Sequence, residues 1–95
     1  MATVVGLWHL RLHVVEAQSL KDKRRVVKGF KDRMAHSHNV SVAEVDALDD
    51  RRFAVLAIAM VCNDRRYAEG ALQQIVNAAS AHRDMILVEH EIEWL

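Results

Sequence analysis

The run Phe53–Cys62 constrains the fold more than any other part of the chain. Its residues are apolar throughout and carry no charge. A membrane-spanning helix needs about 20 such residues, so a run of this length does not cross a bilayer. It is typical of a strand that is buried on much of both faces, as in the middle of a sheet. The sequence therefore predicts a central strand here, with other strands beside it and helices over it.

The segment Val4–Val15 predicts a second central strand, because its residues recur with the period of two that places side chains on one face. One face carries Val4, Trp8, Leu10, Leu12 and Val14. The other face carries Val5, Leu7, His9, Arg11 and His13. We expect the first face to pack on the core and the second to remain open.

Two further strands are expected at Val40–Val45 and from about Met85 onward. In the last strand, alternation assigns to the core face Ile86, Val88, His90, Ile92 and Trp94. The opposite face receives Leu87, Glu89, Glu91 and Glu93, with the three acids across from His9, Arg11 and His13. We therefore expect Trp8 and Trp94 to be buried beneath the helices, and charges to pair across strands on the open face.

Helical periodicity occupies the two segments between the strands. Ser19 is a favourable N-cap, with Asp22 at the third helical position, and the first helix is expected to end near Ser37–Asn39. Its apolar stripe is Leu20, Val27, Phe30 and Met34, with Val26 beside it. Asn63 and Asp64 cap a second helix. The stripe of that helix is Tyr67, Ala68, Ala71, Leu72, Ile75, Val76 and Ala79.

The order strand, helix, strand, strand, helix, strand predicts one domain over residues 1–95. Each helix must cross back over the sheet, and right-handed crossovers place both helices on the same face. The arrangement with the fewest conflicts is the α+β, ferredoxin-like β-α-β-β-α-β fold, with an antiparallel four-stranded sheet in the order 4-1-3-2. This order makes the first and third strands central, in agreement with their higher apolar content.

Three segments carry a resemblance to a known family: Ala17–Arg25, Asn39–Val45 and the pair Asn63-Asp64. The chain resembles the YlxP-like family of small bacterial proteins over nearly its whole length. Asp22 stands where Glu is usual in that family. The resemblance implies a ferredoxin-like domain without an assigned enzymatic activity. It also implies a genetic neighbourhood, because members are often encoded beside genes of translation initiation and ribosome maturation.

Composition bounds the cellular environment and the charge distribution. Cys62 is the only cysteine, so no disulfide can form within the chain, which suits a reducing compartment. The N-terminal residues lack the basic region and long apolar run of a signal peptide, so we expect a cytoplasmic protein. The formal net charge is +0, but the segment Ser19–Ser37 holds seven basic residues and two acidic ones. The molecule is neutral as a whole and polarised along its sequence.

The first helix carries the candidate anion-binding site, which consists of Lys21, Lys23, Arg24, Arg25, Lys28 and Lys31. Most of these residues form a stripe beside the apolar face, while Lys23 projects toward that face. In the first two turns the positive end of the helix dipole disfavours each cation by roughly 0.3–1 kcal/mol. A sequence selected for stability alone places acids there, so the pattern favours an anionic ligand, with RNA phosphate in first place. The simpler interpretations are a solvated helix face, or pairing with acids such as Glu16, Glu44 or Asp46.

The open face of the sheet is the second candidate site. Ferredoxin-like RNA-recognition domains stack bases on aromatic residues of this face, and here only Phe53, at a strand end, is available. Base recognition on the sheet is therefore disfavoured. An apolar patch on one side of a sheet favours homodimerisation instead, and the expected interface residues are Val5, Leu7, Val55, Ala57 and Ala59. The simpler interpretation is a modestly apolar open face.

No catalytic or metal-binding constellation is recognisable in the sequence. His9 and His13 share a strand face, but about 13 Å separates them, which is too far for one ion. Cys62 is expected to pack as a small hydrophobic residue. The three glycines are scattered and form no phosphate-binding loop. We expect no enzymatic activity, no metal and no cofactor.

The sequence therefore favours a non-enzymatic binding protein whose first helix docks on RNA phosphates, in a ribosomal context. The alternative is a homodimeric protein-interaction module that presents the basic helix to an acidic protein. The first hypothesis requires salt-dependent binding that nuclease abolishes, whereas the second requires binding that survives nuclease.

Overall fold

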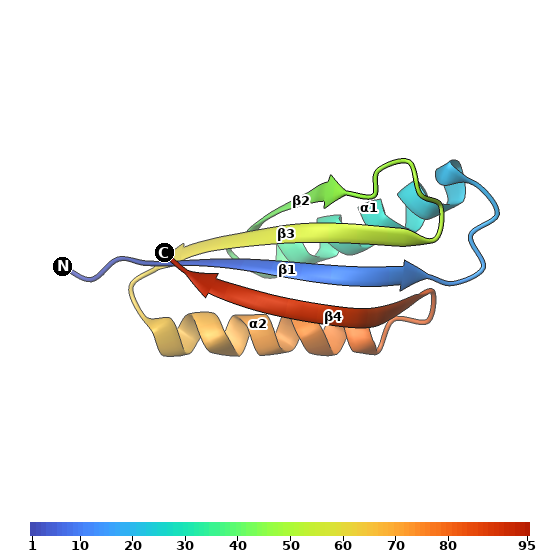
Figure 1. The fold of residues 1–95 in the computed structure, drawn as a ribbon. Coiled ribbons are helices and arrows are strands. Elements are labelled where there is room, and N and C mark those ends of the chain that lie inside the picture. The colour runs from blue at the N-terminus through green and yellow to red at the C-terminus, as the bar shows by residue number, and fades with distance from the viewer.

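The computed structural model describes all 95 residues. In chain order its elements are β1 (Val4–Val14), α1 (Leu20–Ser37), β2 (Ser41–Asp46), β3 (Phe53–Cys62), α2 (Arg65–Ser80) and β4 (Met85–Trp94). The strands form one antiparallel sheet in the order β2-β3-β1-β4, and both helices lie on the same face of it (Figure 1). The structure confirms the predicted ferredoxin-like fold and the central positions of β1 and β3.

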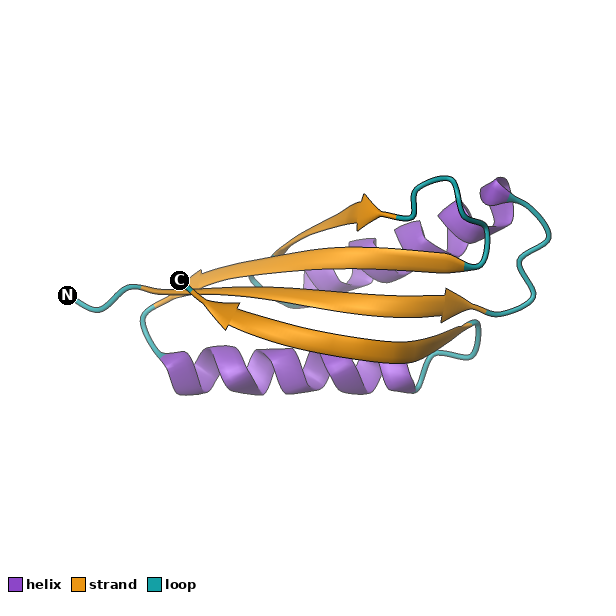
Figure 2. Cartoon of the chain, in the orientation of Figure 1, coloured by secondary structure: helices purple, strands orange, loops and turns teal.

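β1 and β3 form the inner pair of the sheet, with β2 and β4 at its edges (Figure 2). Trp8 of β1 pairs with Ile58 of β3 on one side and with Ile92 of β4 on the other. Successive side chains of a strand point to opposite faces, and every second residue of β3 from Ala54 to Met60 is buried beneath the helices. The apolar run of β3 is therefore explained by its position between two other strands.

The core lies between the sheet and the two helices. Trp8, Leu10 and Leu12 of β1 are fully buried and belong to one cluster with Phe30 of α1 and Ile75 of α2. Burial of a large apolar side chain contributes about 1.5–3 kcal/mol. α1 packs on the side of β2, and α2 packs on the side of β4 (Figure 1). The side of α1 that faces away from the sheet is therefore exposed to solvent, next to β2.

Both helices begin at the caps that the sequence predicts. The Ser19 hydroxyl accepts the backbone N–H of Asp22 at 3.1 Å, and the Asp22 carboxylate accepts the N–H of Gln18 at 3.1 Å. At α2, the Asp64 carboxylate accepts the N–H of Arg66 at 2.9 Å. These bonds satisfy N–H groups that have no partner within the helix. Neither helix combines the length and the apolar composition that crossing a membrane requires.

A β-bulge in β4 changes the predicted alternation of that strand. The register between β1 and β4 shifts between Arg11 and Leu12, which leaves Val88 without a partner in the ladder. An inserted residue reverses which side chains face the core. Leu87 therefore packs against the core, whereas Ile86 and Val88 are exposed. The prediction that Ile86 and Val88 face the core is wrong, because periodicity does not reveal a single inserted residue.

Three other predicted core residues differ in their burial. His90 is exposed, and Tyr67 of α2 is 61% exposed, so neither belongs to the core as predicted. Trp8 is fully buried as predicted, while Trp94 is half-buried. Trp94 packs against the core, and the guanidinium of Arg65 lies 4.5 Å from a ring centroid of its indole. After the bulge, Trp94 therefore faces the core as predicted, and the side chain of Arg65 from α2 covers part of its indole ring.

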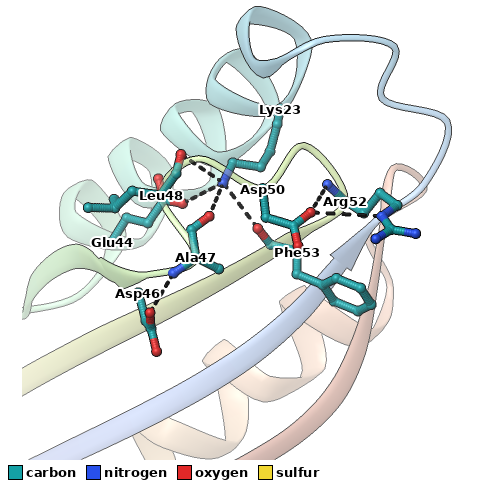
Figure 3. Close-up of polar contacts among 8 residues, drawn as sticks. All are labelled: Lys23, Glu44, Asp46, Ala47, Leu48, Asp50, Arg52 and Phe53. Carbon is teal, nitrogen blue, oxygen red and sulfur yellow. Dashed lines mark hydrogen bonds and ion pairs between the residues drawn. The ribbon is translucent and has the colours of Figure 1, made fainter.

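Lys23, in the first turn of α1, is the one charged residue in the buried interior (Figure 3). Its Nζ donates hydrogen bonds to the carbonyl oxygens of Ala47 at 2.8 Å and Phe53 at 3.0 Å. The Oε2 of Glu44 lies 2.9 Å from the same nitrogen. The ammonium group has three N–H donors, and a third carbonyl oxygen, that of Leu48, accepts at 3.4 Å. The Glu44 carboxylate neutralises the charge as an ion pair. These four contacts surround the ammonium group. They fix the start of α1 to β2, to the β2–β3 turn and to the start of β3.

The β2–β3 turn that receives Lys23 contains a residue in an unfavourable conformation. Ala47 has φ 57°, a left-handed value that costs a non-glycine residue about 1–2 kcal/mol. Its N–H donates to Asp46 Oδ1 at 2.7 Å, and its carbonyl accepts the N–H of Asp50 at 3.0 Å as well as the Lys23 ammonium. These hydrogen bonds hold the strained residue in place.

Replacing Lys23 with Met should lower the free energy of unfolding by about 3–5 kcal/mol, because Glu44 then becomes an uncompensated, largely buried charge. The double variant Lys23→Met/Glu44→Leu should recover part of this loss. Lys28→Met is the control, since it removes an exposed cation of the same helix and should change stability by about 0.5 kcal/mol or less. Chemical denaturation measures all three variants. Equally small effects at positions 23 and 28 would contradict a structural role for the buried ammonium.

Candidate anion-binding surface

The cations predicted on α1 differ in their surroundings. Lys23 is buried in the cluster described above, where no external anion can reach it, and so it leaves the candidate set. Lys28 is exposed, but its Nζ lies 2.6 Å from Oδ2 of Asp32, one helical turn later. No carboxylate oxygen lies within 4.0 Å of the remaining cations, which are Lys21, Arg24, Arg25 and Lys31.

We call Lys21, Arg24, Arg25, Lys28 and Lys31 the basic face of α1. A helix turns by about 100° per residue, which places Lys21, Arg25 and Lys28 opposite the buried Phe30. Arg24 and Lys31 flank the buried stripe beside Val27. All of them are exposed except Lys31, which is half-buried. The first residues of the basic face lie at the positive end of the helix dipole, so their charges repel the helix end unless an anion is bound there.

Four further arginines lie on or beside α1, and three of them come from turns that only the tertiary structure brings there. Arg51 and Arg52 of the β2–β3 turn line a hollow together with Leu20, the first residue of α1. Arg33 of α1 and Arg83 of the α2–β4 turn line another hollow. The positions of the arginines in the two turns depend on contacts between segments that are far apart in the sequence. Acids share both hollows: Asp49 and Asp50 line the first, and Asp84 lines the second. The surface beside the predicted helix stripe therefore carries charges of both signs.

His82 lies in the α2–β4 turn, close to Arg33 and Arg83. Its ring packs edge-on against Phe30, with the ring centroids 6.2 Å apart. The backbone N–H of Asp84 donates to Nδ1 of His82 at 3.0 Å, so the neutral ring carries its proton on Nε2. Burial lowers the pKa of His82 below its ordinary value of 6.5, and the positive charge of Arg33 lowers it further.

The open face of the sheet has an apolar end and a charged end. Cross-strand pairs place Val5 beside Val61 and Leu7 beside Ala59, and all the predicted dimer-interface residues are half-buried in the single chain. Val61, next to them, is 58% exposed. We call Val5, Leu7, Ala57, Ala59 and Val61 the apolar end of the open face. The predicted Val55 lies outside it, opposite Arg11.

Charged residues surround a shallow hollow of about 300 Å³ at the other end of the open face. Its charged and imidazole side chains are His9, Arg11, Asp46, Glu89, His90 and Glu91. The guanidinium of Arg11 lies 5.0 Å from the ring centroid of Phe53, and the ring of His13 lies 5.2 Å from it. These two side chains pack on Phe53, so a base would compete with them for its ring.

β4 carries a row of acids on the open face. Glu91 lies opposite His9 and Glu89 lies opposite Arg11, as predicted. The expectation of an acid across from His13 is wrong, because the bulge places Ile86 there and Glu93 lies opposite Leu7. No cation lies within 4.0 Å of the Glu89 or Glu91 carboxylate, so the charges are cross-strand neighbours without a close ion pair. No group of three His, Cys, Asp or Glu side chains is close enough together to hold a metal ion.

The free energy of unfolding should decrease as the pH decreases below about 6.5. In that range the unfolded chain binds a proton on His82, whereas the folded protein keeps this side chain neutral. Its contribution is complete above about pH 6.5 and is lost as the pH falls toward the lowered folded pKa. His82→Gln should remove this part of the pH dependence, as measured by denaturation from about pH 8 to about pH 5. A pKa of His82 at or above 6.5 in an NMR titration of the folded protein would contradict the expectation.

Comparisons with known proteins agree with the observed fold, and none of the matched proteins has a stated activity. "Uncharacterized protein YlxP" of Bacillus subtilis (strain 168) is 26% identical over 91 residues, which cover 96% of this chain and 99% of that protein. The solved structure "De novo designed protein Foldit4" matches with a TM-score of 0.56 at 16% identity, over 98% of this chain and 96% of that chain, and this likeness concerns the fold alone. The family model described as "Protein of unknown function (DUF503)" matches residues 5–92. The resemblance to YlxP-like proteins is thereby confirmed, and the chain belongs to this family of unknown function.

Proposed function

We propose that this protein binds RNA through phosphate contacts made by the basic face of α1. The observation that carries the proposal is that Lys21, Arg24 and Arg25 are exposed near the positive end of the helix with no carboxylate within 4.0 Å. Like charges at that end destabilise the free helix, and a bound anion offsets their repulsion. Lys23 has a structural role in the interior and Lys28 pairs with Asp32, whereas Lys21, Arg24 and Arg25 have no such partner.

Phosphate contacts fit the surface better than base recognition does. The basic face contains no aromatic side chain, and on the sheet the ring of Phe53 is packed against Arg11 and His13. Phosphate contacts position a protein without reading base sequence, so we expect similar affinities for different RNA sequences. Ribosomal RNA is the first RNA to test, because the family resemblance implies neighbouring genes of ribosome maturation.

Affinity for single-stranded RNA should fall steeply as salt rises. Five phosphate contacts give a log–log slope of about −3.5, and removal of one contact should reduce its magnitude by roughly 0.7. Lys21→Ala and Arg25→Ala each remove one exposed cation. Lys28→Ala should have a smaller effect, because Lys28 must first leave its ion pair with Asp32. Fluorescence anisotropy across a salt series measures each slope.

Arg66→Ala is the matched control for these variants, since Arg66 is exposed but lies on α2. Replacing all five residues of the basic face with Ala should abolish most binding to RNA and ribosomes, and it should keep the fold because Ala is a better helix former. Wild-type affinity in that variant would show that the basic face is an ordinary solvated surface. Capture of a cellular partner that survives nuclease would indicate an acidic protein in place of RNA.

We propose homodimerisation as a second candidate, on the evidence of the apolar end of the open face. This patch joins β1 and β3 and includes Val61, a valine that is 58% exposed in the single chain. A two-fold dimer brings the same patch of each copy together, so one apolar patch suffices to form the interface. The basic face lies on the helix side of the sheet and stays accessible in such a dimer.

Ala59→Glu should give a folded monomer if the apolar end is a dimer contact, because two buried carboxylates then face one another while the core is unchanged. Gln74→Glu, on the exposed side of α2, adds the same charge away from the patch and serves as the control. Sedimentation equilibrium measures both variants. A wild-type monomer at high micromolar concentration would eliminate this candidate.

A further inference from the structure

A groove runs along the side of α1 that faces the α2–β4 turn, and we call it the α1 groove. It consists of three adjoining hollows, of which the central one has a volume of about 350 Å³. The central hollow shares Arg25 and Asp84 with one neighbour, and it shares Arg33 and His82 with the other. The groove thus joins the basic face of α1 to the turn that carries Arg83.

Gly29 lines the central hollow, one turn after Arg25 and one turn before Arg33. A Cβ atom at this position would meet no heavy atom within 4 Å. The packing of the fold therefore does not require glycine here, although glycine inside a helix is less stable than Ala by about 1 kcal/mol. A glycine permits a ligand to approach the backbone closely. Its place between two arginines leaves room for a group that both can contact.

Positive charge surrounds this gap. Arg25 and Arg33 have no carboxylate oxygen within 4.0 Å. The neutral ring of His82 adds an N–H at Nε2, because its Nδ1 already accepts a hydrogen bond from the backbone of Asp84. Two arginines and an imidazole N–H therefore line the same hollow as a single acid, Asp84.

The acids in the groove have other partners or lie outside its centre. The Asp22 carboxylate, in a neighbouring hollow, accepts the N–H of Gln18 at 3.1 Å as part of the helix cap. Asp84 is the only acid in the central hollow, and its Oδ1 lies 3.8 Å from Nε of Arg83. Neither acid lies within 4.0 Å of Arg25 or Arg33, so both arginines lack a direct ion pair.

We propose that the α1 groove holds one phosphate group of the bound RNA at Gly29, between Arg25 and Arg33, with His82 and Asp84 on its opposite wall and Arg83 in the adjoining hollows. Arginine presents a planar fork of donors that matches phosphate oxygens. The absence of a side chain at Gly29 gives the phosphate access to both arginines. This inference rests on the proposed function, because the phosphate belongs to the RNA that the basic face binds. It adds a defined position to a surface that otherwise attracts RNA by charge alone.

Gly29→Gln tests the groove without changing any charge, since the new side chain extends into the space that the phosphate requires. Gly70→Gln is the matched control, because Gly70 is a glycine of α2 whose Cβ position is equally open. Both variants should be at least as stable as the wild type, as Gln is the better helix former. We expect Gly29→Gln to weaken binding of a short single-stranded oligouridylate about tenfold, the effect of losing one charge-assisted contact, and Gly70→Gln to leave it unchanged.

The pKa of His82 provides a second readout, measured by NMR with and without the oligouridylate. The charged groups around His82 are Arg33 on α1 and Arg83 and Asp84 in its own turn. A phosphate in the groove should raise the pKa of His82, because a nearby anion favours the imidazolium. At about 0.15 M salt the screening length is about 8 Å, so RNA bound only on the outer side of α1 has little effect. The rise should be absent in Gly29→Gln.

The possible outcomes separate this inference from the proposed function. Wild-type affinity in Gly29→Gln, with an unchanged pKa of His82 on RNA binding, would overturn the groove and leave the basic face as the RNA site. An equal loss of affinity in Gly70→Gln would also overturn the groove, since the effect would then be general to helix glycines. Failure of the wild-type protein to bind RNA would refute the proposed function and this inference together.

Discussion

The buried ammonium group of Lys23 joins α1 to the sheet through one charged contact. Its partners are the carboxylate of Glu44 and the carbonyl oxygens of Ala47 and Phe53, which come from β2, the following turn and β3. Removal of an ion from water costs several kcal/mol, so such a contact is stable only when all its partners are in place. The position of the first turn of α1, and with it the direction of the basic face, depends on this arrangement.

The two uses of lysine on α1 follow from helix geometry. Lys23 shares its side of the helix with Val27 and Phe30 and is enclosed with them, whereas Lys21 and Arg24 point to solvent. Glu44 neutralises the buried cation, whereas Lys21, Arg24 and Arg25 lie near the positive end of the helix with no carboxylate oxygen within 4.0 Å. Stability therefore explains the presence of Lys23, whereas we infer that the exposed cations serve to bind a partner. The same reasoning extends to Arg25 and Arg33, which flank a helix glycine that packing does not require.

Much of the fold was predictable because short-range patterns determine it. Alternation placed Trp8 in the core, and the caps at Ser19 and Asp64 located both helix starts. The bulge at Val88 was not predictable, because one inserted residue leaves no mark on a short alternating strand. The candidate site was predictable only in part. The chain pattern showed the basic stripe and a lysine directed at the apolar face, but which carbonyls receive that lysine depends on the tertiary arrangement. The sequence also did not show that the α2–β4 turn lines the α1 groove, because this too depends on the tertiary arrangement.

The most direct test of the central claim is an NMR map of backbone amide shifts when single-stranded RNA is added to the wild-type protein. We expect the largest shifts at Lys21, Arg24 and Arg25 and along the flank of α1 that faces the α2–β4 turn. We expect little change on β1 and β3, and Lys23 should keep its contacts in the bound state. Shifts concentrated on the open face of the sheet, or no shifts on α1 at an RNA concentration that saturates binding, would contradict the claim that α1 is the RNA-binding surface.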